Sequence, residues 1–176
     1  VAYGTFPEAP QSNVWSVLAQ AADLGNAVAI NDPVHIAAEF NHQLGNAGCL
    51  PGITWYFGTD HNPGPGQVDF LATAVHELMH GLGFLSFVGP DGALAGGFID
   101  NYSSFLFNNS TSKSWKVMNN SERAASILSN GNLVWNGAKT TSMNSLLQAG
   151  SKTGGKVRLF APSSYESGSS TSHFDT

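Results

Sequence analysis

The sequence predicts a single α+β domain in which a twisted sheet supports one long helix, and a long insertion follows that helix. Three observations indicate this class. A chain of 176 residues suits one domain with a continuous hydrophobic core. Both strand-like and helix-like segments occur along the chain, and no fixed period relates the short elements after the long helix, so there is no internal repeat. Residues 70–80 contain no helix breaker, so a helix of about three turns is expected there.

The composition restricts the classes of partner. Charged residues make up 11% of the chain, so its surface must depend on neutral polar groups, as in many extracellular proteins. A net charge of −5 with seven Lys plus Arg offers no basic surface for nucleic acid. The longest apolar runs are far shorter than the roughly 20 residues that span a bilayer. We therefore expect a secreted, monomeric protein without a membrane span.

The N-terminal half contains three predicted elements before the long helix. Residues 12–25 have apolar side chains at helical spacing and end in Gly25, which indicates a helix. Residues 34–41 alternate apolar and polar side chains, as a half-buried strand does. Residues 53–58 are β-branched and aromatic and predict a second strand. Pro and Gly in residues 61–67 then predict a turn.

The long helix has recognisable ends. Asp69 can cap its N-terminus, and Gly81 and Gly83 can end it. The apolar side chains that would anchor it are Phe70, Leu71, Ala74, Val75 and Leu78.

Residues 88–167 are predicted to form a peripheral insertion subdomain whose loops cover a core built elsewhere. In a Gly-, Ser- and Asn-rich background, they contain a helix at 121–130, an apolar stretch at 133–135, a second helix near 141–150 and a strand at 156–160. Cys49 is the single cysteine, which excludes an intrachain disulfide and argues against a cysteine-rich zinc site.

The segment VHELMHGLGFLSF, residues 75–87, contains two histidines at zinc-ligand spacing. His76 and His80 are four residues apart, so on a helix they lie one turn apart on the same face. Glu77 is rotated by about 100° from His76 and can reach a water on the metal without binding the metal itself. This geometry suits hydrolysis of an amide with Glu77 as general base. The alternative is a buried helix whose histidines are satisfied by other groups.

A third ligand has to come from elsewhere in the chain. The compact metzincin motif H-E-x-x-H-x-x-G-x-x-H fits through Gly83, but Ser86, a poor zinc ligand, occupies its last position. His173, in the Gly- and Ser-rich segment GSSTSHFDT, can approach a metal closely. Asp100 is a rival, because an acidic residue on a following helix completes the site in gluzincins and aspzincins.

Other side chains are weaker candidates for the metal. Glu122 and Glu166 are more simply explained as a helix N-terminal charge and a loop charge. Asp175 could orient a ligand or lie exposed near the end of the chain. The remaining candidates are the histidines that precede the helix, which are His35, His42 and His61.

HELMHGLGFLSF, followed by a long insertion and then GSSTSHFD, resembles the leishmanolysin-like branch of the metzincins and its secreted bacterial relatives. The resemblance extends from about Val34 to Asp175 and is specific only in the two histidine segments. It implies a metzincin-like zincin catalytic domain. It assigns zinc ligation to His76, His80 and His173, and the role of general base to Glu77.

One feature departs from the metzincin pattern. Metzincins have a methionine turn after the third histidine, whereas Met79, Met118 and Met143 all precede His173. The resemblance therefore implies a catalytic domain whose C-terminal part is truncated.

Three functions remain open from the sequence. The first is a secreted zinc endopeptidase that acts on a protein or peptide, with residues 53–58 as the edge strand that holds the substrate. The second is a zinc amidohydrolase that acts on non-peptide amides. The third is a non-catalytic secreted zinc-binding module, against which Glu77 argues because a structural site needs no base.

Overall fold

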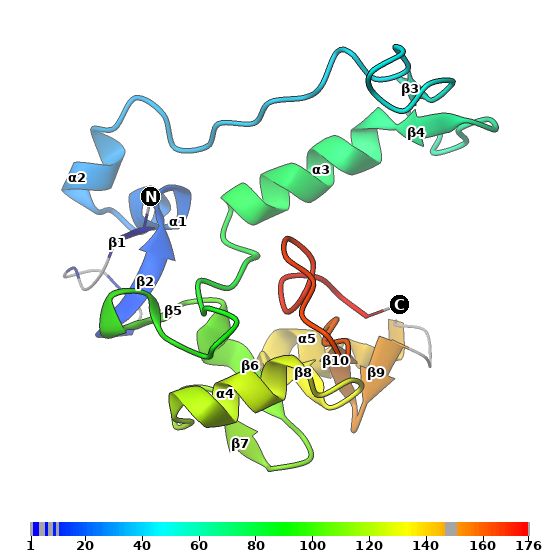
Figure 1. The fold of residues 1–176 in the computed structure, drawn as a ribbon. Helices are drawn as coiled ribbons and strands as arrows, with labels where there is room; N and C mark the ends of the chain where they lie inside the picture. Colours follow the sequence, from blue (N-terminus) through cyan, green and yellow to red (C-terminus); the bar gives the residue numbers. More distant parts are fainter. Residues whose placement is uncertain (1, 4–5, 7–8, 10, 147–150, 176) are drawn as a thin grey trace.

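The computed structural model describes residues 2–3, 6, 9, 11–146 and 151–175, and Figure 1 shows how their elements are arranged. The strands are β1 (Ala2–Tyr3), β2 (Val14–Val17), β3 (Thr54–Tyr56), β4 (Gln67–Asp69), β5 (Ile99–Asp100), β6 (Leu106–Asn108), β7 (Lys113–Ser114), β8 (Leu133–Trp135), β9 (Lys152–Thr153) and β10 (Lys156–Arg158). The helices are α1 (Leu18–Asp23), α2 (Ala27–Ile30), α3 (Phe70–Gly81), α4 (Asn120–Ile127) and α5 (Ala138–Ser142), with 3-10 turns η1 (Ala95–Gly97), η2 (Ser103–Phe105) and η3 (Asn144–Leu146). Short strands and helices are thus mixed, and the sheets are small.

A five-stranded antiparallel sheet supports the larger hydrophobic core. Its strand order is β7-β6-β8-β10-β9. Leu106 and Leu133 on neighbouring strands are fully buried and belong to the same core cluster as Trp115 and Ile127. The buried members of this core cluster are Val14, Val88, Ile99, Tyr102, Leu106, Trp115, Met118, Ile127, Leu133, Leu159 and Ala161.

This cluster corrects the prediction that residues 88–167 only cover a core built elsewhere. Except for Val14, every buried member of the larger core lies between Val88 and Ala161. Trp135 packs against the cluster, whereas Leu146 is 76% exposed. β6 pairs with β8 so that Leu106 lies opposite Trp135 and Phe107 lies opposite Val134, which places large apolar side chains next to one another across the two strands. The region therefore builds the main core instead of lying outside it.

The small sheet β1-β2-β5 joins the N-terminal segment to this core. β2 pairs antiparallel with β1 and parallel with β5. The helix predicted over 12–25 is therefore wrong in its first half and found only as α1 (Leu18–Asp23). Val14 and Ser16 alternate inward with period two, and β5, far away in the sequence, supplies the backbone partner that makes a strand favourable. Gly25, with φ of 84°, follows the helix end as expected.

β3 and β4 form a separate parallel pair next to the N-terminus of α3 (Figure 1). The strand predicted over 53–58 is found at Thr54–Tyr56. The strand predicted over 34–41 is wrong, because this segment forms no strand within the described residues. Its alternating pattern is not matched by burial, since Val34 is 55% exposed and no neighbouring strand supplies backbone partners.

α3 is capped as the sequence predicts. The Asp69 carboxylate accepts a hydrogen bond from the Ala72 N–H at 3.0 Å. The helix ends at Gly81, and Gly83 then takes a φ of 101°, which a side chain would strain, so that the chain can turn away. In the described part of the chain, no helix is long and apolar enough to cross a membrane.

The middle of α3 is not buried, contrary to the prediction of five apolar anchors. No residue of α3 is buried, and Val75, Leu78 and Met79 are between 43% and 52% exposed. Phe70 does anchor the N-terminal end, through ring contacts with three aromatic residues, which are Phe40, Trp55 and Phe57. The helix is therefore held mainly at its ends.

The cap at Asp69 predicts an acid-sensitive start of α3. The hydrogen bond from the Ala72 N–H, and then that from the His61 ring, hold the pKa of Asp69 below its ordinary value. This stabilisation is present above the ordinary carboxyl pKa of about 4 and is lost as the pH falls through the lower folded pKa. Asp69→Asn keeps an acceptor oxygen without the charge. We expect the difference in unfolding free energy between wild type and variant, measured in urea, to shrink from about pH 6 to about pH 3; a constant difference would contradict this account.

Candidate metal centre

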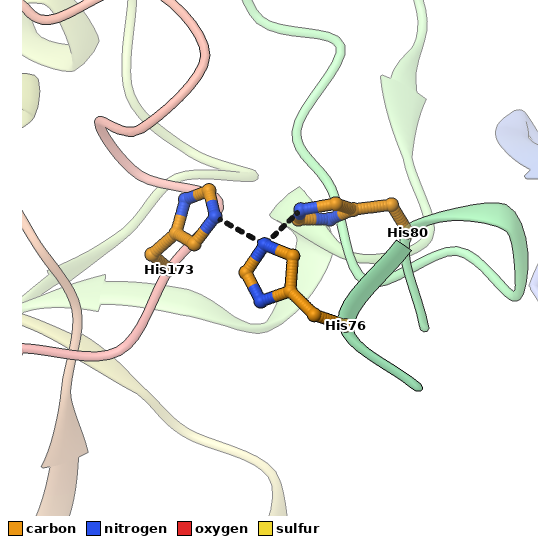
Figure 2. A group of neighbouring side chains, drawn as sticks. All are labelled: His76, His80 and His173. Carbon is orange, nitrogen blue, oxygen red and sulfur yellow. Dashed lines mark hydrogen bonds between the residues drawn. The ribbon is translucent and has the colours of Figure 1, made fainter. Parts of the chain in front are cut away.

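Three histidines from distant parts of the chain converge at one point. His76 and His80 project from α3, and His173 comes from the C-terminal segment (Figure 2). The Nε2 atom of His76 lies 3.1 Å from Nε2 of His80 and 2.9 Å from Nε2 of His173. The ligand atoms of all three lie within 4.8 Å of one another, and no other such group of His, Cys, Asp or Glu occurs among the described residues. We call these three residues the histidine cluster.

Backbone carbonyls orient two of the three rings. Nδ1 of His80 donates to the carbonyl oxygen of Phe84 at 2.7 Å, and Nδ1 of His173 donates to that of Ser169 at 2.8 Å. The positive φ of Gly83 turns the chain so that the Phe84 carbonyl faces the ring one turn back. Sequence reasoning missed both carbonyls. Gly83, three residues after His80, is a sequence signal for the Phe84 carbonyl. Nothing in the local pattern indicates the Ser169 carbonyl.

These contacts define where the protons are. A carbonyl oxygen only accepts, so Nδ1 of His80 and of His173 must carry a hydrogen, and in the neutral rings Nε2 presents a lone pair. Nε2 of His76 has at most one hydrogen to offer to these two lone pairs. Desolvation, followed by repulsion from His80 and His173, lowers the pKa of His76, which favours its neutral form. The cluster is therefore rich in lone pairs and short of protons.

A tetrahedral metal ion would satisfy this arrangement. Zinc–nitrogen bonds of 2.0–2.1 Å place neighbouring ligand nitrogens about 3.3 Å apart. The separations of 3.1 and 2.9 Å differ from this by only a few tenths of an ångström. The carbonyl partners on Nδ1 are also typical of metal-binding histidines, whose other nitrogen donates to a carbonyl or carboxylate. Two of the three separations are therefore close to those of a tetrahedral site, and the three imidazoles are of a kind that could hold a metal ion.

Backbone pairing carries His173 to the helix. Leu159 and Phe174 form an antiparallel bridge. The Phe160 N–H donates to the carbonyl of His173 at 2.8 Å, and the Asp175 N–H donates to that of Arg158 at 3.1 Å. The Asp175 carboxylate forms an ion pair with Arg158. Asp175 therefore helps to hold the segment and does not orient a histidine directly.

The histidines that precede α3 lie outside the cluster. Nε2 of His35 contacts the Ala29 carbonyl at 2.8 Å. His42 contacts its neighbour Gln43, and Nδ1 of His61 lies 2.8 Å from the Asp69 carboxylate. Each is thus a loop or turn residue with a partner of its own.

The acidic candidates are also engaged elsewhere. The Asp100 carboxylate is 3% exposed and accepts from the N–H groups of Phe87 at 3.0 Å and Ser103 at 2.7 Å. Burial raises the pKa of Asp100, while these hydrogen bonds oppose the rise. Glu122 completes a capping box at the start of α4, and Glu166 is exposed. Asp100, the main rival for the third ligand, therefore faces backbone amides instead of the histidine cluster.

Glu77 lines a cavity beside the cluster. The cavity has a volume of about 420 Å³ and lies between α3 and the extended segment 35–39. Its lining includes Leu18, Ile36, Glu39, Glu77, His80 and Phe87. A smaller apolar cavity of about 160 Å³, with Met79, Phe84 and Phe174 in its wall, adjoins the three histidines. β3 lies in the segment predicted above to be the substrate edge strand, but it lines neither of these cavities. Segment 35–39 lines the larger cavity instead.

A family model described as SPBPB7E8-like matches residues 26–146, which is more than half of the chain. The chain belongs to the SPBPB7E8-like family. The matched range includes α3 with His76, Glu77 and His80, and it ends before His173. No curated protein and no solved structure matches the chain.

The carbonyl contacts predict the tautomers of two histidines in the metal-free protein. We expect long-range proton–nitrogen NMR spectra to show His80 and His173 with a protonated Nδ1 and an unprotonated Nε2, because each Nδ1 faces a carbonyl. His42, whose ring has no carbonyl partner of this kind, is the comparison within the same spectrum. A protonated Nε2 with a bare Nδ1 at His80 or His173 would show that the carbonyls do not orient these rings.

Proposed function

We propose that the chain is a secreted zinc endopeptidase of the metzincin type, with His76, His80 and His173 as zinc ligands and Glu77 as general base. One observation carries this proposal: three imidazoles bring their Nε2 atoms together, with those of His80 and His173 at 3.1 and 2.9 Å from that of His76, while carbonyls accept from two of their Nδ1 atoms. A structural zinc site has four protein ligands, whereas three leave a position open for chemistry. The low content of charged residues, 11%, agrees with an extracellular protein.

Zinc, when bound, would make a water acidic enough to act as a nucleophile near pH 7 and would polarise the substrate carbonyl. A side chain of the protein would transfer the proton. Glu77 follows the first proposed ligand directly and lines the larger cavity together with His80, so it borders the space in which a substrate would bind. It would accept a proton from the attacking water and give it to the leaving amine. An uncharged carboxyl or amide at this position could not accept that proton.

The larger cavity suits an extended peptide. Segment 35–39 is exposed apart from Ile36, extended, and without a strand partner in the described part of the chain. Its N–H and C=O groups could therefore pair with the backbone of a substrate, which is how extended peptides bind beside many sheets and grooves. A volume of about 420 Å³ holds one or two side chains of such a peptide. This favours a peptide over a small amide.

The general-base role predicts that Glu77→Gln separates binding from hydrolysis. We expect the variant to retain one zinc per chain by elemental analysis, because Glu77 is not a ligand. We expect kcat/KM on casein or gelatin to fall by a factor of about 10² to 10⁴, since proton transfer is lost. Glu39→Gln, a second glutamate in the wall of the same cavity, is the matched control for a loss of charge alone. Loss of zinc from the Glu77 variant would disprove the role, and cleavage of small amides without casein or gelatin would favour an amidohydrolase.

The ligand set predicts unequal effects at the two rival positions. His173→Ala should raise the zinc dissociation constant by more than about 100-fold, beyond the range typical of residues that only support a ligand. Asp100→Asn should change it by less than about tenfold and lower the melting temperature, because Asp100 holds buried backbone amides. His42→Ala, an exposed histidine outside the cluster, should match wild type. The reverse order of the first two effects would assign the third ligand to Asp100.

A further inference from the structure

Ser86 stands where a compact metzincin motif has its third histidine, and it contacts the residue that precedes His173. The backbone N–H of Ser86 donates to the Ser172 hydroxyl at 3.0 Å. This hydrogen bond joins the segment that follows α3 to the segment that carries the third histidine, across 86 positions of sequence. Ser86 is thus linked to the residue next to His173.

Ser86 is itself held by a partly buried network of hydrogen bonds. Its hydroxyl accepts from the Val88 N–H at 3.2 Å and lies 2.8 Å from the hydroxyl of Ser103. Ser103 is fully buried, and its N–H donates to Asp100. The other oxygen of Asp100 accepts from the N–H of Phe87. Ser86 therefore presents its N–H from a fixed position, which allows it to fix Ser172.

A second anchor lies on the other side of Ser172. The Tyr102 hydroxyl donates to the carbonyl of Thr171 at 2.7 Å in a buried environment. Burial holds the pKa of Tyr102 well above its ordinary value, so the hydroxyl keeps the proton that it donates. Thr171 is 4% exposed and takes a φ of 69°, a left-handed conformation that needs external support in a β-branched residue. The N–H of Thr171 donates to the carbonyl oxygen of Phe160 at 2.7 Å.

We propose that Ser172 and Tyr102 are positioning residues for the metal centre: through the Ser86 N–H and the Thr171 carbonyl they hold the backbone from which His173 reaches the other two histidines. This inference rests on the proposed function. Among the described residues, the other backbone hydrogen bonds of residues 171–173 are those with Phe160, and Ser169 accepts from the His173 ring. Groups that orient a ligand in this way typically change metal affinity by 10- to 100-fold when removed.

The test uses the full chain with Zn²⁺ alone and with Co²⁺ alone. Ser172→Ala removes the acceptor, Ser172→Thr keeps it, and Ser167→Ala is the control in the same loop, where the side chain is exposed. We expect Ser172→Ala to raise the zinc dissociation constant about tenfold and to alter the visible absorption of the cobalt form. Its metal-free melting temperature should stay close to that of wild type. Ser172→Thr and Ser167→Ala should behave as wild type in all three measurements.

A double-mutant comparison separates positioning from general loosening. If Ser172 acts through His173, the tenfold effect of Ser172→Ala should disappear when His173 is already Ala. Tyr102→Phe should weaken zinc binding in the same direction, and it decides the question if Ser172→Ala fails to fold. Unchanged zinc affinity in Ser172→Ala and Tyr102→Phe, no rescue by Thr, or an effect that persists without His173 would each overturn the proposal. A wild-type chain that binds no zinc would instead overturn the proposed function, and the positioning role with it.

Discussion

The pairing of residues 171–175 with residues 158–160 is the constraint on which the histidine cluster depends. It brings His173 to His76 across 97 positions of sequence. Closing a loop of that length costs conformational entropy. Backbone hydrogen bonds and the ion pair between Arg158 and Asp175 offset this loss when the chain folds. A metal ion would therefore meet a site that is already assembled.

Contacts at the two ends of α3 explain how two histidines can be well oriented on a helix that has no buried residue. Its N-terminal end is held by the aromatic contacts of Phe70 and by the Asp69 cap. Its C-terminal end continues through Gly83 into the segment that joins the main core at Val88. Between these ends the helix stays accessible, so the histidines and Glu77 lie beside cavities instead of inside a packed core. The ends of α3 thus hold the helix in place, and its middle leaves the histidines and Glu77 accessible.

The sequence and the structure differ where partners are distant. The alternating pattern of residues 34–41 predicts a strand, yet a strand forms only where a second one supplies its backbone partners, and none lies beside this segment in the described residues. Residues 14–17 show the opposite case: their helical spacing predicts a helix, but they form a strand because β5 pairs with residues 14 and 15 and β1 pairs with residues 16 and 17. The strands of residues 88–161 are too short to predict a core individually. Together they bury Leu106, Leu133 and Leu159 completely, which no local pattern could indicate.

Local geometry by itself determined how His76, Glu77 and His80 lie relative to one another. Four residues of helix bring His76 and His80 to one face and place Glu77 beside them, because the helical rotation per residue is the same in any protein. The cap at Asp69 and the turn at Gly83 are equally local. Sequence alone also nominated His173, but it left Asp100 as a rival, since spacing along the chain does not limit distance in space. Only the tertiary structure shows where each of them lies: backbone pairing brings His173 to the other two histidines, whereas the buried Asp100 carboxylate accepts from the amides of Phe87 and Ser103. Such contacts depend on segments far apart in the sequence, and they exist only once the core has formed.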